Sequence, residues 1–383
     1  MSVGLICEFN PFHNGHKYII DKARSITNTD VICVMSGSFV QRAEPAIINK
    51  FIRTKIALDC GASAVIQLPT KFSTANAELF AHGAIEVLKN VRSITHLAFG
   101  VETDDTKALF KIAEIKNSPL TNELVKQELN SGISYPNAIT NAICKQLDNK
   151  EKYSEILNKP NNVLAIEYIC ALKNTNIIPT PIRRMGNDYN DLTLNGKFLS
   201  ASAIRHAVFS NETEKIREFV PTKTIESFST LPDLKLFDSL CLYALRKLSI
   251  EQLRNLPDVE SGMEYTIKNA INNPSLSQAI EQIKSKRYTY ARIKRICLQA
   301  LLGINNDIMS DINSVYTRVL GIKKEFRAQL CHLNPNIITR NSNASESFEQ
   351  DKSVIIDVFA DDIYSLLTHS NANTYYKEGM IIA

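Results

Sequence analysis

The chain has 383 residues, of which 44% are hydrophobic and 22% are charged, and its net charge is +4. This length exceeds one ordinary hydrophobic core, so we expect two domains, and the composition excludes a disordered or fibrous protein. No apolar run reaches the roughly eighteen residues of a membrane span and no signal-like segment opens the chain, so we expect a cytoplasmic protein. Eight scattered cysteines without a Cys-x-x-Cys pair argue against a zinc site or a disulfide framework.

The first 24 residues form one local unit that predicts an anion-binding turn. Residues 3–7 are a short apolar run that suits one buried strand, and residues 8–15 contain Asn-Pro and Asn-Gly, which favour turns. From His16 onward the apolar residues recur with helical spacing. The first turn of a helix exposes unpaired backbone N–H groups and the positive end of the helix dipole, so this unit suits a phosphate.

Two histidines, His13 and His16, flank Gly15 at the start of that helix. Imidazoles donate hydrogen bonds to phosphate oxygens and to charge that develops during group transfer. Glycine lets a ligand approach the backbone closely. The arrangement therefore predicts a nucleoside triphosphate beside both histidines. The simpler interpretation is that the two rings only cap a helix or bind a metal.

Strands and helices alternate through the first half of the chain. Strands are expected at 30–36, 64–69, 96–100 and 177–184, and helices at 49–58, 75–88 and 160–172. This alternation predicts the α/β class, with a doubly wound, Rossmann-like parallel sheet that is covered on both faces. Such sheets bind ligands beyond the carboxyl ends of their strands, where Gln41, Arg42 and Glu44 are candidates for positioning a substrate. The polar, helical residues 104–158 are expected to form an insertion or lid.

The second half of the chain reads differently. Residues 199–205, Leu-Ser-Ala-Ser-Ala-Ile-Arg, open another helix, where Ser200 and Ser202 can be plain N-caps or phosphate ligands and Arg205 matches phosphate geometry. After residue 221 helices dominate, and we expect them at 234–255, 264–272, 276–302 and about 311–332, followed by a short strand at 354–358. We therefore predict a catalytic domain at 1–221 and a mainly helical domain at 222–383.

The densest basic cluster of the chain lies in residues 284–295. If this segment is helical, Arg287 and Lys294 share one face. Most such runs are simply solvated. The alternative is contact with RNA phosphates, with Tyr288 or Tyr290 stacking on a base.

Two of these segments carry a resemblance to a known family. The string Cys-Glu-Phe-Asn-Pro-Phe-His-Asn-Gly-His at 7–16 resembles the bacterial tRNA(Met) cytidine acetate ligases, which belong to the His-x-Gly-His nucleotidyltransferase superfamily. Residues 199–205 resemble the second motif of that superfamily, Ser-x-Ser/Thr-x-Ile-Arg. The likeness extends through most of the chain and is also specific at 134–136 and 160–162. It is weaker at 183–191, where the family has a glycine-richer run.

The resemblance implies roles for particular residues. The catalytic group would be His13, His16, Ser202 and Arg205. The ATP-binding residues would be Cys7, Glu8, Phe9, Asn10, Pro11, Phe12, His13, Asn14, Gly15, His16, Lys17, Ile20, Gly100, Asn162 and Arg184. The simpler interpretations are a surface lysine for Lys17, a strand-end turn for Gly100, a helix cap for Asn162 (with Asn161 an equal candidate) and a surface arginine for Arg184. The tRNA-binding residues would be Lys284, Arg287, Arg292, Lys294 and Arg295.

The resemblance also implies a reaction. ATP, with Mg²⁺ bridging its phosphates, would activate acetate as acetyl-adenylate, and the acetyl group would pass to N4 of the wobble cytidine of elongator tRNA(Met). No protein ligands for a metal, no membrane and no obligatory protein partner are expected. One alternative is a cofactor-pathway nucleotidyltransferase that adenylates a phosphorylated small molecule. Another is a nucleotide-binding RNA adaptor without chemistry.

Overall fold

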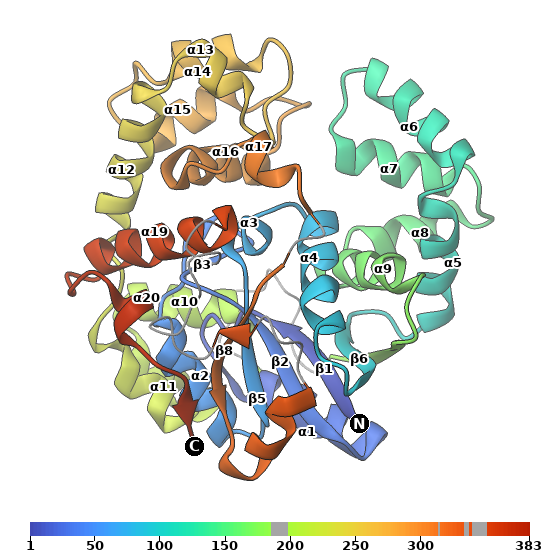
Figure 1. Ribbon diagram of the computed structural model, residues 1–383. Coiled ribbons are helices and arrows are strands. Elements are labelled where there is room, and N and C mark those ends of the chain that lie inside the picture. Colours follow the sequence, from blue (N-terminus) through green and yellow to red (C-terminus); the bar gives the residue numbers. More distant parts are fainter. Residues whose placement is uncertain (185–197, 313–314, 333–336, 339–350) are drawn as a thin grey trace.

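The structure is a computed structural model, and it describes residues 1–184, 198–312, 315–332, 337–338 and 351–383. At its centre is an eight-stranded sheet in the order β10-β8-β5-β2-β1-β6-β7, with β9 paired to β8 (Figure 1). Five of these strands come from the first half of the chain and run parallel: β1 (Ser2–Cys7), β2 (Asp30–Ser36), β5 (Ala64–Leu68), β6 (Ile94–Val101) and β7 (Ile178–Arg183). The expected parallel α/β sheet is confirmed.

Three strands from the end of the chain complete one edge of the sheet. They are β8 (Thr317–Ile322), β9 (Ile337–Ile338) and β10 (Ile381–Ile382). β8 pairs antiparallel with β5, whereas β9 and β10 pair parallel with β8. The helix expected at about 311–332 is therefore wrong in its centre, because residues 317–322 are buried as a strand and only Lys324–His332 (η3) is helical.

Helices cover both faces of the sheet. Alternate side chains of β1 point to opposite faces and so show which helices cover which face. Val3 and Leu5 join the core under α1 (Asn14–Thr27) and α2 (Lys50–Asp59), whereas Ile6 joins the core under α4 (Ala77–Lys89) and α9 (Pro160–Leu172). Gly4 faces α4, where an added Cβ would lie 2.8 Å from a methyl of Leu88. A close helix–strand contact thus depends on this glycine. The short α3 (Thr70–Ser73) precedes α4.

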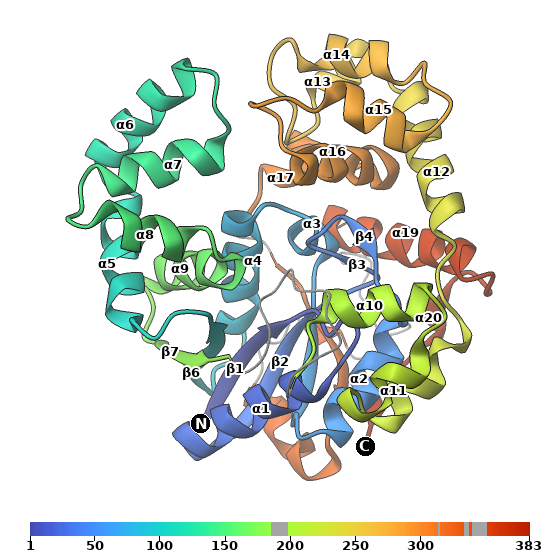
Figure 2. The same cartoon turned by 180° about the vertical axis from the view of Figure 1, so that it is seen from behind.

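Residues 104–158, which were expected to form a helical insertion or lid, contain four helices. They are α5 (Thr106–Lys116), α6 (Pro119–Asn130), α7 (Tyr135–Cys144) and α8 (Lys150–Leu157). Side chains of α5, α7 and α8, such as Leu109, Ile143 and Tyr153, extend the hydrophobic core outward from α9. The two views show this group standing at the same end of the sheet as a second group of helices (Figures 1 and 2).

The second helical group contains α12 (Leu234–Lys247), α13 (Ile250–Arg254), α14 (Met263–Ala270), α15 (Leu276–Ile283), α16 (Tyr290–Leu302) and α17 (Asn306–Met309). It has its own core, which also takes in Phe39 and Ala43 of the hairpin formed by β3 (Phe39–Val40) and β4 (Glu44–Pro45). The helices expected at 234–255 and 276–302 are each interrupted. The second break follows from Thr289, whose side chain caps α16 by accepting from the backbone N–H of Arg292.

The strand expected at 354–358 is wrong, because these residues lie inside helix α19 (Lys352–Leu367). Val354, Asp357, Asp361 and Tyr364 recur three or four residues apart and are buried on one face of that helix. Tertiary contacts therefore override the β-propensity of the Val-Ile-Ile run.

The remaining elements link these parts. They are α10 (Ala201–Phe209), η1 (Thr213–Phe219), α11 (Thr222–Glu226), η2 (Ser227–Ser229) and α20 (Thr374–Lys377). Over the described ranges, no helix combines the length and the apolar character that crossing a bilayer requires. The boundary between residues 221 and 222 stays a prediction, and the structure adds that strands from beyond it belong to the central sheet.

Candidate active site

The loop between β1 and α1 holds its two histidines in a reciprocal cap. His13 is the N-cap of α1, and its Nδ1 accepts a hydrogen bond from the backbone N–H of Gly15 at 3.1 Å. The backbone N–H of His13 in turn donates to Nδ1 of His16 at 3.2 Å. Two backbone donors of the helix start are thereby satisfied. Gly15 is needed for this turn, since an added Cβ would lie 2.9 Å from Cε1 of His13.

This cap decides which nitrogen of each ring faces a ligand. Because both Nδ1 atoms accept hydrogen bonds, the neutral rings carry their proton on Nε2 and can donate from it. Burial, helped by the nearby charges of Arg184 and Arg205, lowers the pKa of His13 from 6.5 to about 3. Burial and the neighbouring His13 lower the pKa of His16 well below its ordinary value. The two stacked rings, with centroids 3.7 Å apart, are therefore two neutral donors near pH 7.

The Nε2 donor of His13 is not used within the described part of the protein. The residue is 2% exposed, its Nε2 is buried, and no described residue forms a hydrogen bond with that atom. Both histidines line the same pocket at the carboxyl ends of β1 and β6. A buried donor without a partner costs free energy, which a ligand in the pocket would recover.

Two arginines supply positive charge to this pocket. Arg184 directly follows β7 and lies against Gly100, where an added Cβ would be 2.9 Å from Cγ of Arg184. Arg205, on α10, donates to the backbone carbonyl of Asn10 at 2.7 Å and to Oγ of Ser202 at 3.3 Å. The guanidinium of Arg205 therefore joins the second sequence motif to the first.

The two serines of the second motif have different positions. Ser200 is buried and caps α10, because its Oγ accepts from the backbone N–H of Ala203 at 3.0 Å. Ser202 lies beside Arg205 and lines a neighbouring groove. The N-cap interpretation thus holds for Ser200, whereas Ser202 reaches the pocket of the histidines only through its contact with Arg205.

Many of the predicted ATP-binding residues do line the pocket. They are Cys7, Glu8, Phe9, Asn10, His13, His16, Gly100 and Arg184, together with Arg205. Gly15 lines a smaller adjoining recess with His13, Tyr18 and Arg184. Burial raises the pKa of the Glu8 carboxyl, although a 2.7 Å hydrogen bond from the backbone N–H of Gln41 opposes this change. Gln41 lines the same pocket, and Arg42 and Glu44 line the neighbouring groove.

Five predicted residues point elsewhere. Phe12 and Ile20 are fully buried in the core between α1 and the sheet, and Pro11 is buried beside Phe12. Asn14 donates to the backbone carbonyl of Glu218 at 2.8 Å, and the exposed Lys17 forms a 2.6 Å ion pair with Asp21. These side chains support the loop and its helix. The surface interpretation of Lys17 is the one the structure favours.

The side chain of Asn162 forms hydrogen bonds away from the pocket, and the neighbouring Asn161 lines the pocket instead. Asn162 is 1% exposed, accepts from the backbone N–H of Glu102 at 2.8 Å and donates to the carbonyl of Ile156 at 3.2 Å. Asn161 instead lines the pocket, and its Oδ1 accepts from Nη1 of Arg184 at 3.4 Å. Its Nδ2 is buried and has no hydrogen-bond partner among the described residues.

Several further lining residues lay outside the sequence prediction. They are Leu5, Ile6, Ile19, Phe80, Phe99, Leu164, Tyr168 and Ala201. The sequence did contain a pattern that could have predicted some of these lining residues. Asn161, Leu164 and Tyr168 are spaced by three and four residues, which places them on one face of the helix that was expected at 160–172.

The basic cluster at 284–295 differs from the expected continuous helix. Lys284 and Arg287 precede α16, so Arg287 and Lys294 do not share a helical face. The five predicted tRNA-binding side chains all have acidic partners: Lys284 lies 3.5 Å from Glu281, Arg287 and Arg292 lie 2.6 and 2.7 Å from Glu260, Arg295 lies 2.9 Å from Asp258, and Lys294 pairs with Glu44. These partners moderate the positive surface that the sequence suggested.

The described part of the chain contains no group of three His, Cys, Asp or Glu side chains that could hold a metal ion. A Mg²⁺ ion at this site would therefore take most of its ligands from phosphate oxygens and water, which is how Mg²⁺ commonly binds with nucleotides.

Comparison with known proteins finds the same likeness along the whole chain. Residues 1–378 match the family described as HIGH Nucleotidyl Transferase. The tRNA(Met) cytidine acetate ligase of Clostridium perfringens is 38% identical over 387 residues, covering 96% of this chain and 95% of that protein. The tRNA(Met) cytidine acetate ligase of a Thermoanaerobacter species is 37% identical over 382 residues, covering 95% and 94%.

Comparison with solved structures finds the same similarity in the fold. Apo TmcAL from Thermotoga maritima superposes with a TM-score of 0.91 at 29% identity, covering 100% of this chain and 99% of that one. TmcAL from the same organism bound with alpha-thio ATP gives a TM-score of 0.89 at 28% identity with the same coverage. These superpositions cover the whole of this chain, and so extend over the β1–α1 loop, α10 and both helical groups.

Proposed function

The chain belongs to the HIGH nucleotidyltransferase family, and we propose that it is an ATP-dependent ligase that joins acetate to a cytidine of tRNA(Met). The observation that carries this proposal is the pair of neutral imidazoles at the start of α1, in a pocket that Arg184 and Arg205 also line. The Nε2 of His13 is buried there and has no hydrogen-bond partner among the described residues. Such a site suits a triphosphate, because it offers neutral donors and cations around one small volume.

The first step would activate the acid. A carboxylate oxygen of acetate attacks the α-phosphorus of ATP, the bond from that phosphorus to the β-phosphate oxygen breaks, and pyrophosphate leaves. His13 and His16 would donate hydrogen bonds to the charge that builds on the α-phosphate, since both Nε2 atoms carry protons. Ser202 and Arg205 would hold the departing pyrophosphate, and Mg²⁺ would enter with the nucleotide.

Adenosine would lie on the other side of the histidines. Gly100 is the second-last residue of β6 and has no side chain, and Arg184 lies against it and lines the same pocket. We propose Gly100 and Arg184, and not the buried Asn162, as the contacts with adenine or ribose. In each case the side chain or the bare backbone is open to the pocket.

The second step would modify the RNA. The N4 amine of the wobble cytidine attacks the acetyl carbonyl, the C–O bond to the adenylate phosphate breaks, AMP leaves and the amine loses one proton to solvent. The helices α12–α17 would contact the tRNA, with Lys284, Arg287, Arg292, Lys294 and Arg295 at the phosphates. In this proposal residues 1–221 carry the catalysis and 222–383 carry the RNA surface.

A direct assay tests the proposal. The protein is incubated with ATP and labelled acetate, with and without tRNA, and label on tRNA is measured together with AMP and pyrophosphate. ATP-dependent label on the cytidine of elongator tRNA(Met) is the expected result. Pyrophosphate release that requires a phosphorylated metabolite, with no label on tRNA, would instead support a cofactor-pathway nucleotidyltransferase.

A further inference from the structure

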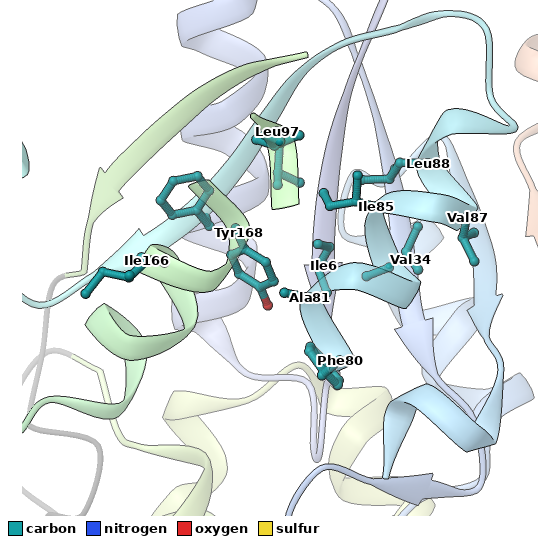
Figure 3. Close-up of a cluster of buried hydrophobic side chains, with 14 of the residues drawn as sticks. Ile6, Val34, Phe80, Ala81, Ile85, Val87, Leu88, Leu97, Ile166 and Tyr168 are labelled. Atoms are coloured by element: carbon teal, nitrogen blue, oxygen red, sulfur yellow. The ribbon is translucent and has the colours of Figure 1, made fainter. Parts of the chain in front are cut away.

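One end of the active-site pocket is apolar and lies on a different side of the sheet from the histidines. Ile6, Phe80, Phe99 and Tyr168 line this end and belong to the core under α4 and α9, with Leu164 packed against them. Figure 3 shows Ile6, Phe80 and Tyr168 converging from β1, α4 and α9, with the hydroxyl of Tyr168 directed toward Ala81. By contrast, Leu5, Phe9 and Ile19 of the same pocket belong to the core under α1.

Aromatic side chains line the apolar end of the pocket. Phe80 and Phe99 are each 2% exposed and Tyr168 is 5% exposed, so these rings present little surface to the pocket. The rings of Phe99 and Tyr168 pack on each other with centroids 5.7 Å apart. A nucleobase would need a large aromatic face in this place, whereas a methyl group needs only a shallow recess.

A hydrogen-bond donor stands at the edge of this recess. Asn161 precedes Leu164 and Tyr168 on the same face of α9. Its Oδ1 accepts from Arg184, which directs the amide nitrogen Nδ2 away from that arginine, and Nδ2 is buried with no partner among the described residues. The backbone N–H of Asn161 donates to Glu102 at 3.1 Å, which holds the start of the helix in place. An amide N–H₂ group is a suitable donor to a carboxylate oxygen.

We propose that this recess is the site of the carboxylic acid, with Phe80, Leu164 and Tyr168 enclosing its alkyl group and Nδ2 of Asn161 holding its carboxylate. The inference rests on the proposed function and adds to it the residues that select a two-carbon acid. In this proposal the aromatic rings limit the length of the alkyl group, so acids with longer chains are disfavoured. Burial in such a recess discriminates by about 10-fold or more for one methylene.

Acid-dependent exchange of pyrophosphate into ATP tests the recess without tRNA. The assay compares acetate, propionate and butyrate for the wild type and for Phe80→Ala and Leu164→Ala. The wild type should prefer acetate, and each variant should raise the ratio of kcat/KM for propionate over acetate by about 10-fold. Leu164 is only partly buried, so the second variant keeps the test usable if Phe80→Ala does not fold. Ile85→Ala is the matched control, because Ile85 is buried on α4 but does not line the pocket.

The amide is tested by Asn161→Asp. This change keeps an oxygen for Arg184 and replaces the donor with a second oxygen, which repels a carboxylate. The KM for acetate should rise by about 10-fold or more while the KM for ATP changes little.

The outcomes separate the recess from the proposed function. If the wild type exchanges pyrophosphate with no carboxylic acid, the proposed activation of acetate fails and the recess assignment fails with it. If the wild type uses acetate but both truncations keep its preference, or if they change the KM for ATP instead, the proposed function stands and the recess assignment is overturned.

Discussion

Arg205 donates a 2.7 Å hydrogen bond to the backbone carbonyl of Asn10, so the guanidinium of the second motif rests on the loop that contains the first. The two residues are 195 positions apart in the sequence. The same guanidinium reaches Oγ of Ser202 and lines the pocket of His13 and His16. The contact therefore brings together the two halves of the proposed triphosphate site, and several predictions about single side chains rest on it.

Replacing His13 by asparagine should separate its two roles. Asparagine is a favoured N-cap, so α1 should keep its start, but the donor at Nε2 is lost. Acetate-dependent exchange of pyrophosphate into ATP should fall by roughly 100-fold, the loss typical of one donor at a developing charge. His82→Asn is the control, since Nε2 of His82 is also buried without a partner in the described part of the chain, and His82 does not line the pocket. Near-normal exchange by a folded His13→Asn protein would contradict the proposed role.

Replacing His16 by alanine tests the second imidazole. The ring accepts from the backbone of His13 and stacks on its neighbour, so its loss removes a donor and loosens the turn. We expect no measurable adenylate formation with a retained fold, checked by circular dichroism and pyrophosphate exchange. A His16→Ala protein that forms acetyl-adenylate at the normal rate would exclude the ring from catalysis.

Arg205→Lys should weaken the nucleotide site even though the charge is kept. A lysine amine cannot hold the carbonyl of Asn10 and Oγ of Ser202 in the same planar geometry. The kcat/KM for ATP should fall by roughly 10- to 100-fold, as expected for a charge-assisted hydrogen bond. Arg217→Lys serves as control, because Arg217 lies in an exposed ion pair with Glu214. Equal effects of both substitutions would show that the hydrogen bond from Arg205 to Asn10 does not contribute to the nucleotide site.

Reversing the charge of both Arg287 and Arg292 should weaken tRNA binding and spare acetyl-adenylate formation. Both side chains pair with Glu260, so Glu260→Gln should have the opposite effect and strengthen binding by releasing them. The measurements are the Kd for tRNA at two salt concentrations and pyrophosphate exchange without tRNA. Lys22→Glu, an exposed position on α1, controls for net charge. Loss of both activities together would argue against separate catalytic and RNA surfaces.

Acid should destabilise the protein partly through His13. Its pKa is about 3 in the folded state and 6.5 ordinarily, so the unfolded chain binds the proton first as the pH falls. Stability should thus decrease from about pH 6.5 toward pH 3, by about 2 kcal/mol at pH 5 from this group. Urea unfolding of the wild type and of His13→Asn at pH 7.5 and pH 5 measures this contribution. The variant should lose less stability on acidification, and identical losses would refute the assignment.

The packing of helix α19 should depend on a buried ion pair. Lys50 on α2 lies 2.5 Å from Asp361 on α19, and their side chains are 1% and 3% exposed. Lys50→Met leaves the carboxylate buried without its cation and should cost about 3–5 kcal/mol of unfolding free energy. The double variant with Asp361→Leu should recover much of that loss. Lys55→Met, at an exposed position of the same helix, should change the stability little.

The sequence by itself determined the local parts of this protein. A strand, a turn with Asn-Pro and Asn-Gly, and an amphipathic helix follow one another within residues 2–27, so this strand–turn–helix unit could be predicted from neighbouring residues. The alternation of strands and helices likewise predicted the parallel sheet, and the serine-rich helix start at Ser200 was visible as a cap.

Only the tertiary structure decided which side chains meet. Asn161 and not Asn162 faces the pocket because the docking of α9 on the sheet fixes which side of the helix turns inward. Residues 317–322 form a strand because they pair with the free edge of β5. Residues 354–358 form part of a helix because the buried face of α19 packs against the rest of the protein. The acidic partners of the basic cluster come from distant segments, such as Glu44 and Glu260. Propensity and spacing act over a few residues, whereas packing, pairing and charge neutralisation act between segments that only the fold brings together.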